Sequence, residues 1–152
     1  MSRKALSNIL ALLGLTVALV YSFSRSLLWG NSLTIEVIGL RSENGLVFMT
    51  IYDNADAFEQ NSTTNYITYA AKRVKKGTAS FSTNRLYGGP YAISVFHDEN
   101  SNEEFDMTND RPTEGWGYSN NVGQIENPKF EAAAIEFTNS DAKFTIHINY
   151  LN

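Results

Sequence analysis

The chain has 152 residues, of which 43% are apolar and 12% aromatic, and this length and content suit one domain around one core. It contains no cysteine, which excludes disulfides, thiolate zinc sites, cysteine nucleophiles and a lipidated N-terminal cysteine. From residue 26 onward, nine basic residues stand against sixteen acidic ones, a net charge of −7. Phosphate binding requires a basic face, so we expect no nucleic-acid partner.

The first two dozen residues have the pattern of an export segment. Arg3 and Lys4 precede a mostly apolar run over residues 9–20, which is the length of a secretory hydrophobic region. Ser22 and Ser24 then offer small side chains in front of a cleavage point. This pattern predicts a cleaved signal peptide over 1–24.

The same segment also fits an N-terminal membrane anchor. Residues 5–23 are long enough to span the hydrocarbon core as a hydrophobic helix, with the two basic residues on the cytoplasmic side. Both interpretations place the folded part outside the cytoplasmic membrane, either periplasmic or extracellular. The membrane is then a partner only through this segment if it is uncleaved. We expect a linker over 25–32 and one domain over 33–152.

Period-two alternation of apolar residues predicts most of the domain as strands. Two strands, over 33–37 and 47–51, flank Asn44-Gly45, a pair that accepts the positive φ values of a tight hairpin turn. Residues 53–64 are polar and are expected to form a loop with one helical turn.

The alternation continues on both sides of the Lys75-Lys76-Gly77 turn, with Ile67, Tyr69 and Ala71 before it and a strand over 79–83 after it.

Residues 91–96 are apolar on both faces, which is typical of a central strand, and this strand leads into His97 and Asp98. Residues 130–134 are expected to form a helical turn or to continue into a strand through 137, and 144–150 alternate as the last strand. The sequence therefore predicts an all-β fold, a single antiparallel β-sandwich of about seven strands, preceded by the N-terminal hydrophobic helix.

The segment 95–121 carries seven of the sixteen carboxylates and a single arginine. Asp98, Asn100, Asn102 and Asp106 stand at offsets one, three, five and nine, a spacing that directs several oxygens at one hard cation. This predicts a candidate calcium loop in which Glu104 adds a backbone carbonyl.

Asp110 or water would complete the calcium coordination. The alternative is a solvated acidic loop whose Asn and Asp side chains cap their own turns. No other cofactor is expected.

Trp116 and Tyr118 follow this loop and are flanked by glycines. Their rings are candidate partner-binding residues that would stack on a sugar or on an apolar protein surface. The alternative is that they fold back and plug the open end of the sandwich.

Three strings occur in an order that resembles the bacterial family called domain of unknown function 2141: Gly89-Pro90-Tyr91, His97-Asp98-Glu99-Asn100, and the segment 112–121 with Gly-Trp-Gly-Tyr at its centre. The resemblance covers residues 33–150. It implies an exported small β-sandwich similar to transthyretin-like and carboxypeptidase regulatory-like modules, or more broadly to immunoglobulin-like ones. Family members carry a glycine where this chain has Glu103, and that departure weakens the calcium interpretation.

These features favour an exported, non-catalytic module that binds an unknown protein or carbohydrate of the cell envelope through the acidic loop. No nucleophile elbow such as Gly-x-Ser-x-Gly occurs, so we expect no enzyme activity. Two alternatives remain. One is a small envelope hydrolase that uses the loop carboxylates Asp98, Glu99, Asp106 and Glu114. The other is a membrane-tethered structural accessory subunit.

Overall fold

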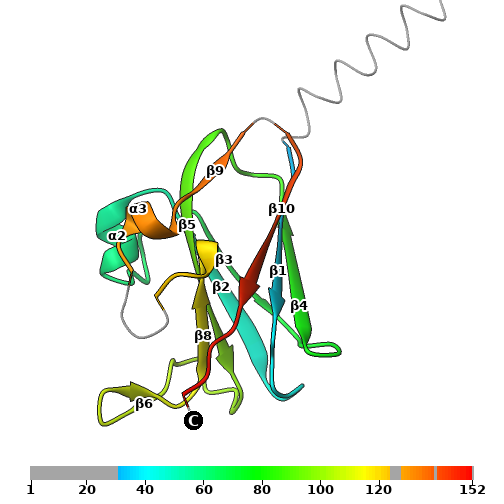
Figure 1. Ribbon diagram of the computed structural model, residues 1–152, viewed down its shortest axis with the longest axis vertical. Helices are drawn as coiled ribbons and strands as arrows, with labels where there is room; N and C mark the ends of the chain where they lie inside the picture. Colours follow the sequence, from blue (N-terminus) through cyan, green and yellow to red (C-terminus); the bar gives the residue numbers. More distant parts are fainter. Residues whose placement is uncertain (1–30, 124–127, 139, 152) are drawn as a thin grey trace, which may run out of the picture.

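The computed structural model describes residues 31–123, 128–138 and 140–151 (Figure 1). The expected signal peptide or anchor over 1–24 lies outside these residues, as does most of the expected linker. In the described part, no helix is both long and apolar enough to cross a membrane. This part is mostly β, with short helical turns between strands.

The smaller sheet has the order β10-β1-β4. Its strands are β1 (Leu33–Ile38), β4 (Thr78–Thr83) and β10 (Ala142–His147). β1 pairs antiparallel with β4 but parallel with β10. The expectation of a wholly antiparallel sandwich is therefore wrong for this pair. A hairpin forces neighbouring strands to run antiparallel, whereas β1 and β10 are far apart in the chain and no short turn fixes their direction.

The larger sheet has the order β3-β2-β5-β8, and β9 also pairs with β5. Its strands are β2 (Leu46–Tyr52), β3 (Thr68–Lys72), β5 (Gly89–Asp98), β8 (Gly115–Tyr118) and β9 (Ile135–Phe137). On the side away from β2, β5 pairs with β9 near its start and with β8 near its end. The expected central strand is confirmed, and it carries its last residues to one end of the molecule (Figure 1).

The two sheets pack face to face across one core (Figure 1). Alternate residues of the facing strands fill it, as the period of two predicts. They include Leu33, Ile35, Val37, Val47, Met49, Ile51, Phe81, Ile93, Val95 and Ile146. This arrangement agrees with a sandwich, and the finer likeness to immunoglobulin or transthyretin modules stays a prediction.

β3 alternates as expected, but the face that it buries is not the one with the larger apolar side chains. Ala70 packs against the core, whereas Ile67 and Tyr69 are 43% and 47% exposed. The larger apolar side chains of this edge segment therefore point away from the core. Alternation defines two faces but does not say which of them is buried.

Two short helices cover part of the outer face of the larger sheet (Figure 1). They are α2 (Ala55–Glu59) and α3 (Phe130–Ala133). Asn54 caps α2 by accepting the Ala57 N–H at 2.9 Å, so the expected helical turn is confirmed. Phe58 and Phe130 pack edge to face at 6.1 Å over Tyr52 and Ala92.

Three strands that were not predicted follow the acidic loop: β6 (Met107–Thr108), β7 (Arg111–Pro112) and β8. β8 contains the Gly-Trp-Gly-Tyr segment and passes into a single 3-10 turn, η1 (Ser119–Asn121). Glycines weaken a strand signal, but here Gly115 and Gly117 lie where β8 crosses the C-terminal segment closely.

Substituting Gly117 with alanine should destabilise the fold. A Cβ at this position would lie 2.7 Å from the His147 carbonyl oxygen and 2.9 Å from Ile146 Cγ2. Because backbone cannot yield easily, we expect Gly117→Ala to lower the free energy of unfolding by about 1–3 kcal/mol. Urea unfolding of the full chain measures this. Ser80→Ala, at an exposed position on β4, is the control, and equal midpoints for the two variants would contradict the packing described here.

Candidate functional site

Asp98 anchors the acidic loop at the end of β5. Its side chain is fully buried. One carboxylate oxygen accepts the Asn102 N–H at 3.2 Å and the other accepts the Glu103 N–H at 3.0 Å. The loop is therefore closed on itself by a charge-assisted pair of hydrogen bonds.

The other three predicted ligand side chains converge in the same loop. The Asn100 and Asn102 Oδ1 atoms accept the N–H groups of Asn102 and Glu104, each at 3.0 Å. Their Nδ2 groups both donate to the Asp106 carboxylate, at 2.6 Å from Asn100 and 3.2 Å from Asn102. The four side chains are thus brought together, and the loop caps its own turns as the alternative interpretation expected.

Glu103 occupies the position where the family that this sequence resembles has glycine, and its φ is +64°. This left-handed conformation is the sharp bend that the position requires, so the chain makes the turn without glycine at some cost in strain. In the described part of the chain, no three or more His, Cys, Asp and Glu side chains are grouped so as to hold a metal ion. A cation in this loop would need amide oxygens in addition to Asp98 and Asp106.

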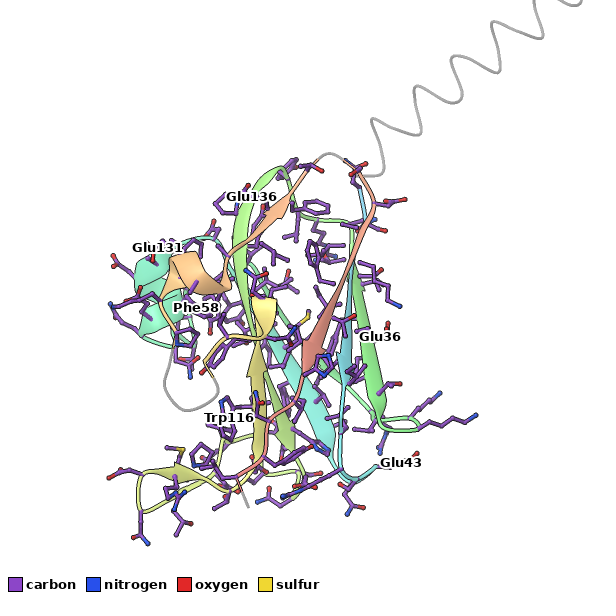
Figure 2. The ribbon with its side chains drawn as sticks, viewed as in Figure 1. Glu36, Glu43, Phe58, Trp116, Glu131 and Glu136 are labelled. Carbon is purple, nitrogen blue, oxygen red and sulfur yellow. The ribbon has the colours of Figure 1, made fainter. Side chains whose placement is uncertain are left out.

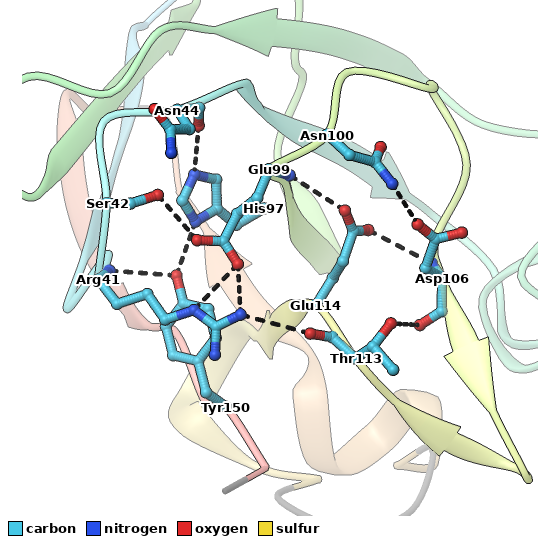
Figure 3. Close-up of polar contacts among 10 residues, drawn as sticks. All are labelled: Arg41, Ser42, Asn44, His97, Glu99, Asn100, Asp106, Thr113, Glu114 and Tyr150. Atoms are coloured by element: carbon cyan, nitrogen blue, oxygen red, sulfur yellow. Dashed lines mark hydrogen bonds and ion pairs between the residues drawn. The ribbon is translucent and has the colours of Figure 1, made fainter.

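Glu114 holds the loop from its other side. Its side chain is buried, and its two carboxylate oxygens accept the Glu99 N–H at 3.0 Å and the Asp106 N–H at 3.3 Å (Figure 3). Burial raises the pKa of Glu114, an effect that the two backbone N–H groups oppose. The sequence indicated this residue only as one carboxylate among several. Its position under the loop is set by β8, which begins at the next residue and was not predicted.

The base of the loop is a polar network that reaches the C-terminal segment (Figure 3). His97 is fully buried, and its Nε2 donates to the Asn44 carbonyl at 2.9 Å. The other ring nitrogen, Nδ1, hydrogen-bonds with the Tyr150 hydroxyl at 2.7 Å. The expectation that His97 hydrogen-bonds within the loop base is confirmed.

Arg41 and Glu99 complete this network. The Arg41 Nε donates to Glu99 at 2.9 Å, and its guanidinium lies 4.4 Å from the centre of the Tyr150 ring. Ser42 Oγ donates to the same carboxylate at 2.8 Å. The hydrogen bond from Arg41 is the main reason why the pKa of Glu99 is lowered. The hairpin, the loop and the C-terminal segment are therefore tied together at one point.

A groove of about 440 Å³ lies on the outer face of the larger sheet, between the covering helices and the acidic loop. Thr50 and Ser94 lie opposite each other in its floor. The outer strands place Tyr69 opposite Thr50 and Tyr118 opposite Ser94. Small hydroxyl residues at the centre and large aromatic ones at the ends produce a hollow about 14 Å across, the width of three strand spacings.

The acidic loop forms one wall of this groove through Glu103, Glu104 and Phe105. Phe105 packs edge to face on Phe96 of β5, with ring centres 5.7 Å apart. The loop and the groove are therefore one structural unit, a relation that sequence spacing alone does not reveal.

Both candidate partner-binding residues line the groove, but neither ring is exposed as a flat stacking surface would be. Trp116 is only 6% exposed, and its indole N–H donates to the Gly123 carbonyl at 3.2 Å. Tyr118 is half-buried and packs edge to face with Phe58. Phe58 and Trp116 lie on the same outer side of the larger sheet (Figure 2).

Sequence reasoning missed Tyr66 and Tyr69 as site residues. Both line the groove with more than a third of their surface exposed. The sequence did offer a signal, because two tyrosines stand close together at the start of the β3 edge strand, where a solvent-facing surface would usually carry polar side chains.

The comparisons with known proteins give a family and one weak structural likeness. Residues 35–145 match the family described as "Uncharacterized protein conserved in bacteria (DUF2141)", which confirms the resemblance drawn from the sequence. No curated protein matches. A crystal structure of a fimbrial assembly protein from Parabacteroides distasonis is similar at 8% identity with a TM-score of 0.39, over 78% of this chain and 52% of that one. The chain spans about half of that protein, and so weak a likeness carries no argument.

The Arg41–Glu99 contact predicts an acid-sensitive contribution to stability. Because the folded-state pKa of Glu99 is lowered, its stabilisation is present above the ordinary glutamate value of about 4.3 and is lost as the pH falls through the lowered value. We expect the free energy of unfolding of the wild type to fall more steeply below pH ~4.3 than that of Glu99→Gln. Glu114 has a raised pKa and the opposite sign, but it is present in both proteins. Denaturant unfolding across this range tests the difference, with Glu136→Gln on β9 as control (Figure 2); parallel curves for wild type and Glu99→Gln would refute it.

Proposed function

The chain belongs to this family of uncharacterised bacterial proteins, and we propose that it is an exported, non-catalytic module that binds an envelope partner in the groove beside the acidic loop. The observation that carries the proposal is the groove itself. Seven of its fifteen lining residues are aromatic, and they stand around a small polar floor, the usual composition of a ligand site. The segment with the export pattern supports placement outside the cytoplasmic membrane.

The hydrogen bonds of the loop carboxylates support a binding role over hydrolysis. Asp98 and Glu114 are buried, and each accepts two backbone N–H groups of the loop. A general acid or base must reach a substrate proton. Carboxylates engaged in this way hold the loop in shape instead.

The second part of the proposal is that calcium occupies the loop and stiffens the groove wall. The convergence of the Asp98, Asn100, Asn102 and Asp106 side chains supports it, because carboxylate and amide oxygens are the ligands that calcium prefers. Calcium would then neutralise carboxylates that otherwise repel one another. Glu103 to Phe105 belong to both the loop and the groove, so ordering the loop would order the site.

Calcium should raise the thermal stability of the full chain. A ligand that binds only the folded state, at a hundred times its dissociation constant, adds about 2.7 kcal/mol, which corresponds to a shift of several degrees in Tm. We expect this shift with calcium, a smaller one with magnesium and none with a chelator. Asp106→Asn should reduce the shift, whereas Asp53→Asn, the same change at an exposed position outside the loop, should preserve it. No shift at millimolar calcium would rule out the metal part of the proposal.

Binding in the groove should depend on the exposed ring of Tyr69. Panels of immobilised envelope glycans and peptides, probed with the full chain, should give signals that Tyr69→Ala abolishes. Tyr87→Ala is the matched control, since Tyr87 is 85% exposed and does not line the groove. Signals that survive Tyr69→Ala would place the binding elsewhere, and the absence of any signal from the wild type would count against a binding module of this kind.

A further inference from the structure

The groove has an unusual balance of side chains. Seven of its fifteen lining residues are aromatic, two are the carboxylates Glu103 and Glu104, and none is Lys, Arg or His. Aromatic faces carry partial negative charge, and carboxylates carry full negative charge. The complement of such a lining is a positively charged ligand.

The rings stand on opposite walls. Tyr66 and Tyr69 form one wall at the β3 side, with ring centres 5.8 Å apart and planes tilted by 46°. Phe96 and Phe105 form the other, with planes 61° apart. Tyr69 and Phe96 each stack on Phe48, with ring centres 5.5 and 5.0 Å apart. At most one face of each of these two rings is therefore open to a ligand in the groove.

The electrostatics of the described residues agree with a cation site. The pKa of Tyr69 is raised, first by burial and then by the nearby charges of Glu103 and Asp98. The pKa values of Tyr52 and Tyr118 are raised mainly by burial, so both phenols stay neutral. The groove therefore combines a neutral hydroxyl floor with a negative rim.

We propose that the groove binds the trimethylammonium group of a small quaternary-ammonium ligand, an inference that rests on the proposed function and names its ligand class. A quaternary ammonium is attracted to ring faces and has no N–H groups that need partners. A primary ammonium would have to pair its N–H groups with the neutral hydroxyl and amide oxygens of the lining, because the two carboxylates are exposed at the rim. Anionic ligands are repelled by the same carboxylates.

The test is a titration of the isotope-labelled full chain in neutral detergent, followed by amide NMR and calorimetry. Choline is the probe, and its neutral tert-butyl analogue has the same shape without the charge. We expect saturable shifts at Thr50, Ser94 and Tyr118, and binding of choline about tenfold tighter than that of the analogue. Phosphocholine carries the same cation together with the phosphate of a lipid headgroup. We expect the rim carboxylates to repel this phosphate and to weaken binding, which would indicate a free ligand; equal binding would indicate a headgroup.

Substitutions in the groove should act on charge and ring separately. Tyr69→Leu should weaken choline binding about fivefold. Glu103→Gln with Glu104→Gln should weaken it and reduce its dependence on salt. Tyr87 and Glu136 lie outside the groove lining, so Tyr87→Leu and Glu136→Gln should change neither the affinity for choline nor its dependence on salt. Phe105→Leu provides a second test of the ring contribution if Tyr69→Leu alters the fold.

Equal affinity for choline and its neutral analogue would overturn the inference, as would choline binding that the Tyr69 and Phe105 variants leave intact. Shifts at the same amides caused by methyl glucoside or by n-butylammonium, and not by choline, would also overturn it. In that case the groove would still be a binding site and the proposed function would stand. If neither these probes nor the glycan and peptide panels engage the groove, both proposals fail.

Discussion

The buried carboxylate of Asp98 is the constraint on which the acidic loop depends. Burying a charge is costly unless it is fully hydrogen-bonded, and the N–H groups of Asn102 and Glu103 meet that requirement. The bond to Glu103 requires the loop to turn back sharply, which explains the left-handed backbone at Glu103. The same turn brings Glu103 and Phe105 to the edge of the groove, so a single buried group shapes both the loop and its wall.

The close approach of the first hairpin to this point has its own requirement. A Cβ on Gly45 would lie 1.7 Å from the Asp98 carbonyl oxygen, and the φ of Gly45 is +67°. Only glycine meets both conditions. With the hairpin so close, His97 can hydrogen-bond with the Asn44 carbonyl and with the Tyr150 hydroxyl. The network thereby fastens the C-terminal segment beneath the loop.

The outer face of the larger sheet combines two environments. Where α2 and α3 lie over Tyr52 and Ala92, it is a second small core. Beyond the helices, Thr50 and Ser94 leave a hollow that only larger neighbours border. The sheet therefore uses one face for the main core and divides the other between packing and the groove. Such a division is consistent with a scaffold on which the loops carry the function.

The sequence by itself determined most of the strands, the first hairpin, the helical turn after β2 and the four side chains that converge in the acidic loop. It could do so because alternation, turn residues and oxygen spacing are local properties. It also singled out Trp116 and Tyr118, which line the groove beside the loop. Only the tertiary structure decided that β10 pairs parallel with β1, that Trp116 is a buried wall, and that Tyr69 faces outward. These outcomes depend on contacts between segments far apart in the chain. Local patterns define two faces of each strand, and packing selects which one is buried.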